Sequence, residues 1–205
     1  MKRKNSVGYF SAYYRGLECL LKMWPKIREQ VPDATLDVYY GWESWLALEG
    51  EDDFYRRMEQ RFADLADHGV TVHGRVSHTE LAKAMSEIQV WAYPTEFTEI
   101  HCITALKAQQ ARCYPVTTNV GALAETVQCG DKIETRIIYS DEYKQEQFID
   151  AVVAALKEGK EGTPVPDTDW SEVASRWERV IEQEIEKASV SAGQDKPAHD
   201  EEGVS

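Results

Sequence analysis

At 205 residues, the chain has the length of one ordinary domain. Hydrophobic residues make up 42% and charged residues 29%, which excludes a disordered polymer, and no apolar run reaches the ~18 residues that a membrane-spanning helix needs. The 23 basic and 36 acidic residues give a net charge of −13, which argues against a general nucleic-acid binder because such a protein needs a basic face. No signal-peptide core follows the basic residues Lys2–Lys4, so we expect a cytoplasmic protein.

The cysteine and histidine patterns point to neither a redox site nor a metal site. The four cysteines include no Cys-x-x-Cys pair, and reduced thiols are expected in the absence of a secretion signal. The five histidines lack the spacing of metal ligands, and His73 and His78 are interpreted as structural or exposed. We therefore expect no bound metal.

Short apolar runs alternate with stretches of helical periodicity along the chain. The runs predict strands at residues 7–11, 35–40, 70–73, 89–93 and 115–118, and a weaker one at 136–139. The periodic stretches predict helices beginning near Leu17, Phe54, Leu81, Ile103, Phe148 and Val173. Pro25 lies inside the first of them and is expected either to kink that helix or to break it in two. This alternation predicts an α/β fold with a doubly wound, mainly parallel sheet and helices on both faces.

The C-terminal segment 189–205 has almost no large apolar residue and no periodicity. It is predicted to be a flexible acidic tail, so that residues 1–188 form the folded domain. Before it, Asp169 is expected to cap the last helix. The tryptophans divide into two groups. Core packing explains Trp24, Trp91 and Trp177, whereas Trp42 and Trp45 follow the second strand and are free to face another domain or a partner.

Ligands of doubly wound sheets bind where strands end and helices begin, and two such junctions carry an arginine beside a glycine. Arg15 and Gly16 follow the first strand, where helix amides and a guanidinium attract phosphate. A solvated arginine on the first helical turn is the alternative. Gly74, Arg75 and Val76 follow the third strand, where glycine lets a flat ligand approach the backbone. An ordinary turn before a helix cap explains that segment equally well.

The junction after the fourth strand carries two carboxylates. Glu96 and Glu99 suit the hydroxyl groups of a sugar, and the amides of Ile100, His101 and Cys102 would face an anion. Plain capping of the next helix is the alternative interpretation. The junction after the fifth strand, residues 117–127, either braces the far end of a ligand or is a simple loop.

Together these junctions resemble the C-terminal half of GT-B glycosyltransferases, in particular the large retaining group called glycosyltransferase family four. The segments that carry the resemblance are Arg15-Gly16-Leu17, Gly74-Arg75-Val76, Pro94-Thr95 with Glu99, and Lys107-Ala108-Gln109 with Pro115-Val116. It spans roughly residues 5–187. The resemblance implies a Rossmann-like half of a GT-B fold.

The resemblance also implies roles for individual residues. Arg15 would contact the donor diphosphate, residues 74–76 would line the base, and Glu99 would be the first carboxylate of the family's Glu-x7-Glu motif, facing the donor sugar. The second glutamate of that motif, which usually binds the ribose, is replaced by Lys107. Ribose hydroxyls can still accept hydrogen bonds from its ammonium, or Glu96 would substitute as the acceptor.

The function that the resemblance implies is binding of a UDP- or GDP-linked sugar for retaining transfer, with no cofactor and no obligatory metal. A GT-B enzyme also has an N-terminal domain that binds the acceptor. The chain is therefore expected to be a fragment, to work with a separate partner, or to lack transfer activity. The alternative is a non-catalytic nucleotide-sugar-binding or regulatory module. A receiver domain is disfavoured, because Ser11, His73 and Gly74 stand where such a domain needs acidic residues.

Overall fold

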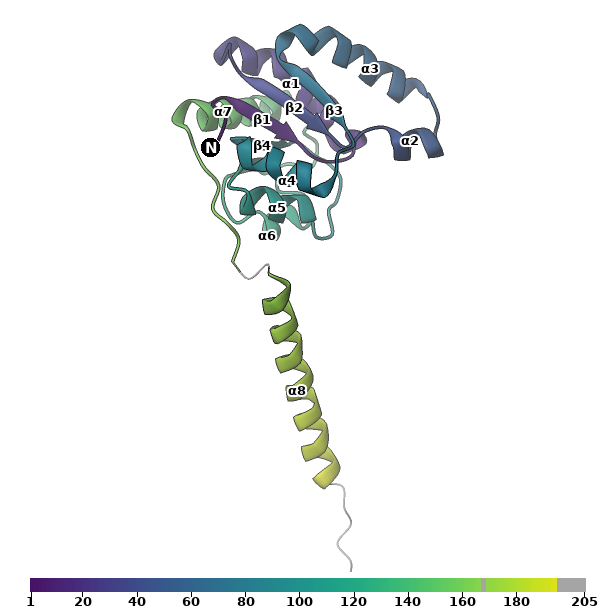
Figure 1. Cartoon of the computed structure of the whole chain (residues 1–205), viewed down its shortest axis with the longest axis vertical. Helices are drawn as coiled ribbons and strands as arrows, with labels where there is room; N and C mark the ends of the chain where they lie inside the picture. The colour runs from purple at the N-terminus through teal and green to yellow at the C-terminus, as the bar shows by residue number, and fades with distance from the viewer. Residues whose placement is uncertain (167–168, 195–205) are drawn as a thin grey trace, which may run out of the picture. The chain divides into compact units, whose positions relative to one another are not determined.

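The computed structural model describes residues 1–166 and 169–194, and its centre is one six-stranded parallel sheet in the order β3-β2-β1-β4-β5-β6 (Figure 1). The strands are β1 (Ser6–Tyr9), β2 (Thr35–Tyr39), β3 (Val70–Gly74), β4 (Val90–Tyr93), β5 (Tyr114–Thr118) and β6 (Asp131–Ile133). All neighbouring strands pair in parallel. The order reverses between β1 and β4, which is the predicted doubly wound topology.

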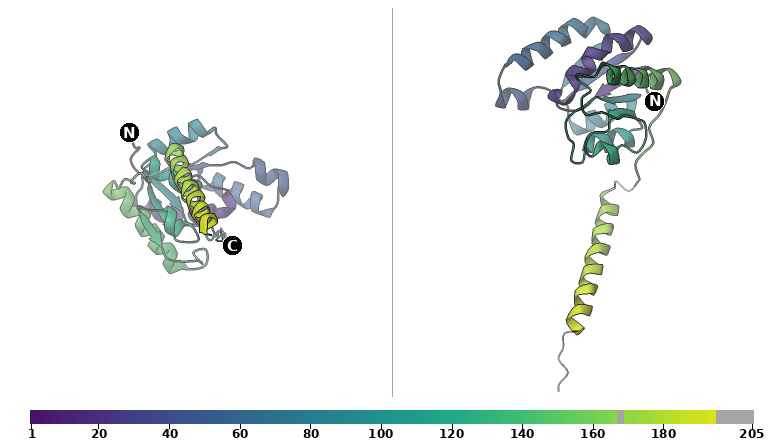
Figure 2. Two further views of the ribbon diagram at one scale, coloured as in Figure 1. Left: turned by 90° about the horizontal axis from the view of Figure 1, so that it is seen from below. Right: turned by 180° about the vertical axis from the view of Figure 1, so that it is seen from behind.

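Helices cover the two faces of this sheet. They are α1 (Leu17–Gln30), α2 (Glu43–Leu48), α3 (Asp53–Leu65), α4 (His78–Glu87), α5 (Ile103–Gln110), α6 (Leu123–Thr126) and α7 (Glu142–Glu158), with short 3-10 turns η1 (Tyr13–Arg15) and η2 (Ala66–His68). Helix α1 packs beside α7, whereas α5 lies between α4 and α6 (Figures 1 and 2). Right-handed crossovers on either side of β1 and β4 place these two groups on opposite faces.

The sixth strand is not where the sequence analysis expects it. Residues 136–139 form a loop, because the Thr135 hydroxyl accepts the amide of Ile137 at 3.1 Å and the Gln145 amide group donates to the carbonyls of Ile138 and Tyr139 at 2.7 and 3.0 Å. The edge strand is the polar segment β6, which has no apolar run to reveal it. The other five predicted strands are confirmed.

Helices α1 and α2 both differ from what the sequence analysis expects. Helix α1 runs unbroken through Pro25, whose ring lies on the exposed side of the helix. The short helix α2 forms where the sequence analysis predicts no helix. It follows Tyr40 and Gly41, whose φ angles of 124° and 84° turn the chain sharply after β2.

The core contains two of the three tryptophans assigned to it. Trp24 and Trp91 are fully buried, and the Trp24 indole donates to the carbonyl of His68 at 2.9 Å. Trp177 belongs to a second unit that begins at Pro166, whereas the compact body comprises Met1–Val165, so core packing of Trp177 stays a prediction.

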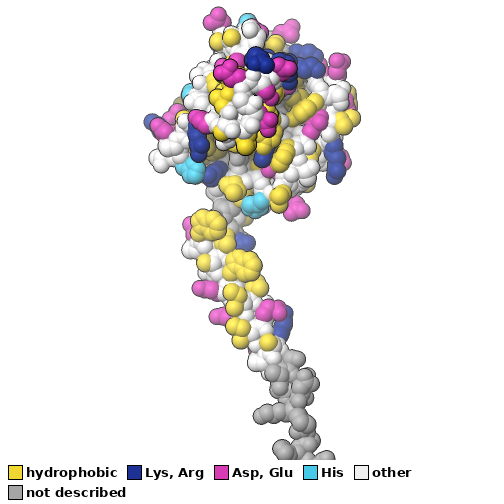
Figure 3. Space-filling view, turned by 90° about the vertical axis from the view of Figure 1, so that its right-hand side faces the viewer, with side chains coloured by type: hydrophobic (Ala, Val, Ile, Leu, Met, Phe, Trp, Pro, Cys, Tyr) yellow, Lys and Arg dark blue, Asp and Glu magenta, His cyan; other side chains and the backbone are white. Residues whose placement is uncertain are grey.

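That second unit contains helix α8 (Trp170–Gln194), whose apolar side chains are exposed along one stripe (Figure 3). The Asp169 carboxylate accepts the amide of Ser171 at 2.8 Å, which is the predicted cap. The expected domain end at 188 falls within α8, and the expected tail begins inside this helix. Residues 195–205 of that tail lie outside the described residues.

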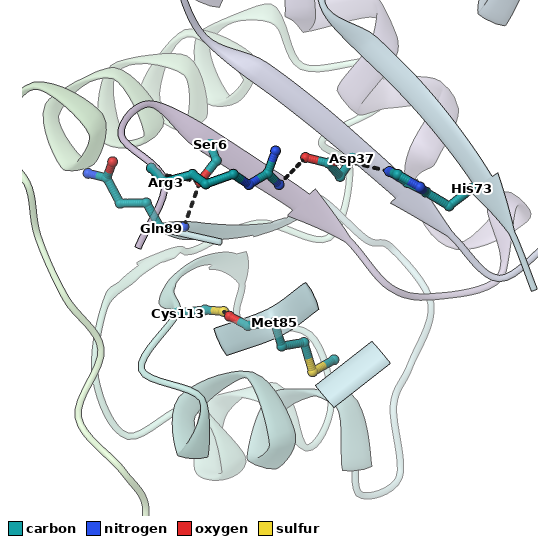
Figure 4. Close-up of polar contacts among 7 residues, drawn as sticks. All are labelled: Arg3, Ser6, Asp37, His73, Met85, Gln89 and Cys113. Carbon is teal, nitrogen blue, oxygen red and sulfur yellow. Dashed lines mark hydrogen bonds and ion pairs between the residues drawn. The ribbon is translucent and has the colours of Figure 1, made fainter. Parts of the chain in front are cut away.

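Partly buried polar contacts fix the sheet edge around β2 and β3 (Figure 4). The Asp37 carboxylate accepts from the Arg3 guanidinium at 2.6 Å and lies 2.6 Å from Nε2 of His73. The ring of Tyr39 stacks on His73 with 4.4 Å between the centroids. These contacts give His73 a structural part in joining the two strands.

Buried thiols make the stability of this fold sensitive to alkaline pH. Burial raises the pKa of the Cys19 thiol from 9.0 to about 12. The unfolded chain loses this proton above about pH 9 while the folded chain retains it, so the contribution is complete below pH 9 and is lost as the pH rises toward 12. Urea unfolding at about pH 8 and about pH 11 measures this loss. The free energy of unfolding should fall less between these two pH values in Cys19→Ala than in the wild type. Equal losses in the two proteins would contradict this expectation.

Candidate functional site

Gly16 brings two loops together at the carboxyl edge of the sheet. It ends η1 and begins α1 with φ 121°, a conformation that favours glycine. A Cβ atom at Gly16 would lie 2.5 Å from the carbonyl oxygen of Pro94, so the start of α1 lies directly against the loop between β4 and α5. This close approach places Arg15 beside the loop that carries Glu99.

Arg15 and Glu99 form an ion pair in this corner. The guanidinium Nη1 lies 3.4 Å from Oε1 of Glu99, whose side chain is only 9% exposed, while that of Arg15 is 30% exposed. The Tyr93 hydroxyl donates to the same carboxylate oxygen at 2.6 Å. Burial, together with the neighbouring Glu99 carboxylate, raises the pKa of Tyr93 far above its usual value. Tyr93 therefore remains a neutral donor and holds Glu99 in place.

Two aromatic rings flank the Arg15 guanidinium. Its Nε donates to the hydroxyl of Tyr14 at 3.2 Å, and its central carbon lies 3.9 Å from the ring centroid of Phe97. The cation is thus held by a carboxylate on one side and by a ring face on another. Its remaining exposed surface is available to an anion.

The junction after β5 braces the Glu99 loop. Glu99 and Gly121 form an isolated parallel bridge, and the amide of Ala122 donates to the Glu99 carbonyl at 2.8 Å. The Thr118 hydroxyl donates to the carbonyl of Thr95 at 2.6 Å, near the start of the same loop. The structure thus shows a role that neither interpretation of this junction named, namely support of the neighbouring loop.

Helix α5 begins immediately after this loop without a side-chain cap. Cys102 occupies the cap position with φ 44°, and its thiol makes no capping hydrogen bond. Burial raises the pKa of that thiol to about 12, so it is neutral. Ile100 is 93% exposed and His101 is also exposed, which leaves this turn accessible from solvent.

The structure does not bring every candidate residue to the Arg15–Glu99 pair. The Glu96 carboxylate accepts the amide of Tyr139 at 2.7 Å and so faces a different loop. Lys107 is exposed on α5, and within residues 1–166 and 169–194 its ammonium forms no ion pair.

The segment expected to line the base also stands apart from that pair. Gly74 ends β3, two strands from β1, and its carbonyl accepts the amide of Tyr40 at 3.0 Å. Arg75 is exposed, and Val76 packs partly against the core. These residues share the carboxyl edge of the sheet with Arg15 and Glu99 but do not contact them.

Sequence reasoning missed the residues that orient this pair, namely Tyr14, Tyr93 and Phe97. Tyr93 offered one signal, because a tyrosine that ends a buried strand needs a partner for its hydroxyl. Phe97 offered none, since its contact with Arg15 arises only when two loops far apart in the chain meet.

Replacing Tyr93 by phenylalanine should destabilise the protein by about 1.5–3 kcal/mol, because a buried hydrogen bond to a charged group is lost. Urea unfolding near neutral pH measures this loss. Tyr143→Phe is the matched control, since that tyrosine is 68% exposed and should tolerate the change. Equal stabilities of the two variants would show that the hydroxyl does not hold Glu99.

The described residues contain neither a metal-binding cluster nor a helix that could span a membrane. No group of three or more His, Cys, Asp or Glu side chains in that part of the chain is placed to hold a metal ion. None of its helices is both long and apolar enough to cross a bilayer.

Comparison with known proteins identifies relatives of the compact body. The family model described as glycosyl transferases group 1 matches residues 4–158. No curated protein matches the chain. Among solved structures, sucrose-phosphate synthase from Thermosynechococcus elongatus is similar with a TM-score of 0.59 at 17% identity, covering 90% of this chain and 46% of the other.

Two further structures were solved with nucleotide ligands. The pneumococcal O-GlcNAc transferase GtfA, in complex with UDP and GlcNAc, has a TM-score of 0.57 at 17% identity and is matched over 77% of this chain and 30% of its own. HepE from Anabaena, in complex with UDP-glucose, has a TM-score of 0.52 at 19% identity, over 76% and 44%. The chain thus spans less than half the length of these structures.

Proposed function

Because the chain belongs to the group 1 glycosyl transferases, we propose that it is the C-terminal, donor-binding domain of a retaining GT-B glycosyltransferase. The single observation that carries the proposal is the contact between Arg15 and Glu99 at 3.4 Å. It places one cation and one carboxylate at the carboxyl edge of the sheet, where doubly wound folds bind nucleotides. A nucleoside-diphosphate sugar needs both groups, since its phosphates are anionic and its sugar carries hydroxyls.

Arg15 is the group that would bind the diphosphate. Its guanidinium offsets the charge that develops on the leaving diphosphate when the glycosidic bond breaks. The amides of Ile100, His101 and Cys102, at the uncapped start of α5, would add donors beside it. The net charge of −13 does not oppose this binding, because charges more than about 8 Å away are screened at physiological ionic strength.

Glu99 is the group that would face the donor sugar, with Tyr93 fixing its position. Gly74, Arg75 and Val76 would line the base. Lys107 is the better candidate for the ribose than Glu96, because the Glu96 carboxylate is already engaged by the amide of Tyr139. We propose no cofactor and no metal for this site.

The ligands of similar structures support UDP as the nucleotide. GtfA was solved with UDP and GlcNAc, and HepE with UDP-glucose. We propose that the acceptor is bound by a second domain, either in the same protein or in a partner, because the similar structures are more than twice as long as the matched part.

Titration calorimetry of the chain with UDP, UDP-glucose and GDP tests this function. Binding of UDP with or without its sugar is expected, and binding of neither UDP nor GDP would refute the proposal. Binding of GDP but not UDP would support the proposed donor site and show that UDP is not its nucleotide.

A non-catalytic nucleotide-sugar-binding module is the second candidate. It is favoured by the replacement of a motif carboxylate by Lys107. Slow hydrolysis of UDP-glucose by the chain alone would exclude it. Binding without any hydrolysis, even with an acceptor domain added, would favour it.

A further inference from the structure

Next to the donor site lies a cavity that the proposed donor-binding residues do not line. It measures about 330 Å³, which is within the size range of small-molecule pockets. Its walls come from η1, from the turn after β2 and from α2, and they include Tyr14, Tyr40, Trp42, Trp45 and Leu48. Figure 3 views the body from the side on which α2 lies and shows hydrophobic side chains at this surface.

The aromatic walls of this cavity are held rigidly. The indole N–H of Trp42 donates to Glu59 at 2.7 Å, and that of Trp45 donates to Asp52 at 3.1 Å. Ring contacts also hold both indoles, with centroid distances of 4.7 Å from Trp42 to Tyr13 and 4.9 Å from Trp45 to Phe54, and the parts of the rings that these contacts leave open line the cavity. The ring centroids of Tyr14 and Trp45 lie 5.7 Å apart, and the angle between the ring planes is 38°, so the two rings are in direct contact. The two rings therefore form a continuous platform, with no space for a ligand between them.

Tyr40 shows that the chain tolerates strain to complete this cavity. It has φ 124°, a backbone angle that residues other than glycine rarely adopt, and the residue is 44% exposed. A strained residue that directs a partly exposed ring into a cavity is typical of a functional site. The helix that closes the cavity, α2, has no buried residue, and Trp45 attaches it to the body by packing against Phe54 with 4.9 Å between the ring centroids.

The polar groups of the lining favour a neutral ligand rich in hydroxyls. Besides the tyrosine hydroxyls, they are the Ser44 hydroxyl and the Glu49 carboxylate, and no lysine or arginine lines the cavity. A carboxylate accepts hydrogen bonds from vicinal hydroxyls, whereas it repels a phosphate or another carboxylate. The negative faces of aromatic rings attract the polarised C–H groups of a pyranose.

We propose that this aromatic cavity, lined by η1 and α2, is a saccharide-binding subsite. Tyr14 joins it to the donor site, because its hydroxyl contacts Arg15 and its ring lies 6.5 Å from that of Phe97. Resting on the proposed function, the bound saccharide is the part of the glycosyl acceptor that lies beside the donor sugar, while the second domain binds the rest of the acceptor.

Saturation-transfer NMR on the full chain tests the subsite. The probes are the methyl pyranosides of glucose, galactose and mannose, N-acetylglucosamine, and uridine, each measured alone. At least one saccharide should give a signal that falls severalfold in Trp45→Ala and in Leu48→Arg. Leu48 is 82% exposed, so its replacement should not affect folding. Ala47→Arg, on the same helix but outside the lining, is the matched control and should keep the signal.

Three results would overturn the proposal: no signal from any saccharide, signals unchanged in both variants, or a uridine signal that alone responds to Leu48→Arg. The last result would make the cavity a nucleobase site. Calorimetry with UDP on the same samples separates this test from that of the donor site. Leu48→Arg should leave UDP binding unchanged, and a chain that binds saccharide but not UDP would refute only the donor site and the acceptor assignment.

Discussion

Replacing Arg15 by alanine is expected to weaken UDP binding about 10- to 100-fold. A charge-assisted hydrogen bond contributes about 1.5–3 kcal/mol, and about 1.4 kcal/mol changes a dissociation constant tenfold. Arg15 is poised for this contact, because Glu99 and the ring of Phe97 already fix its guanidinium and 30% of its side chain is exposed. Titration calorimetry with UDP measures the change.

Two further variants sharpen this test. Arg15→Lys keeps the charge but loses the planar two-pronged donor, so it should recover only part of the affinity. Arg56→Ala, on the exposed side of α3 and paired with Asp53, removes an arginine of the same charge and should bind UDP as the wild type does. If Arg15→Ala also bound UDP like the wild type, the diphosphate would lie elsewhere.

Gly16→Ala is expected to cost about 2–6 kcal/mol of unfolding free energy. The φ of 121° strains any other residue by about 1–3 kcal/mol, and overpacking adds about 1–3 kcal/mol because the new Cβ would meet the carbonyl oxygen of Pro94 at 2.5 Å. Relief of that clash must move α1 away from the loop that carries Glu99. We therefore expect UDP binding to be lost together with stability, as measured by urea unfolding and calorimetry.

Gly159→Ala is the matched control for this substitution. Gly159 ends α7 with φ 66°, and a Cβ atom there would meet nothing within 4 Å. It should cost only the backbone strain, about 1 kcal/mol, and leave UDP binding intact. Equal costs at the two glycines would show that the contact with Pro94 is easily relieved and that Gly16 has no special part in the site.

Most of the fold could be predicted because strands and helices are local patterns. The strands β1, β2, β4 and β5 are buried and therefore rich in apolar residues, and the helices between them carry apolar stripes with the helical period. The exposed strand β3 could be predicted from its β-branched residues. β6 was not predicted because an edge strand needs no apolar run. The strand predicted at residues 136–139 was wrong because Ile138 is apolar for another reason, namely burial within a loop. Helix α2 was not predicted because it buries no residue and therefore has no apolar stripe.

What the sequence by itself determined is the type and order of these elements, the topology that follows from them, and the presence of an arginine and a glutamate at two strand ends. Only the tertiary structure decided which of those groups meet. Arg15 and Glu99 are 84 positions apart, and their contact depends on the close approach of Gly16 to Pro94. The same folding turned Glu96 toward Tyr139 and closed the α2 cavity, because contacts between loops depend on three-dimensional packing that no local period records.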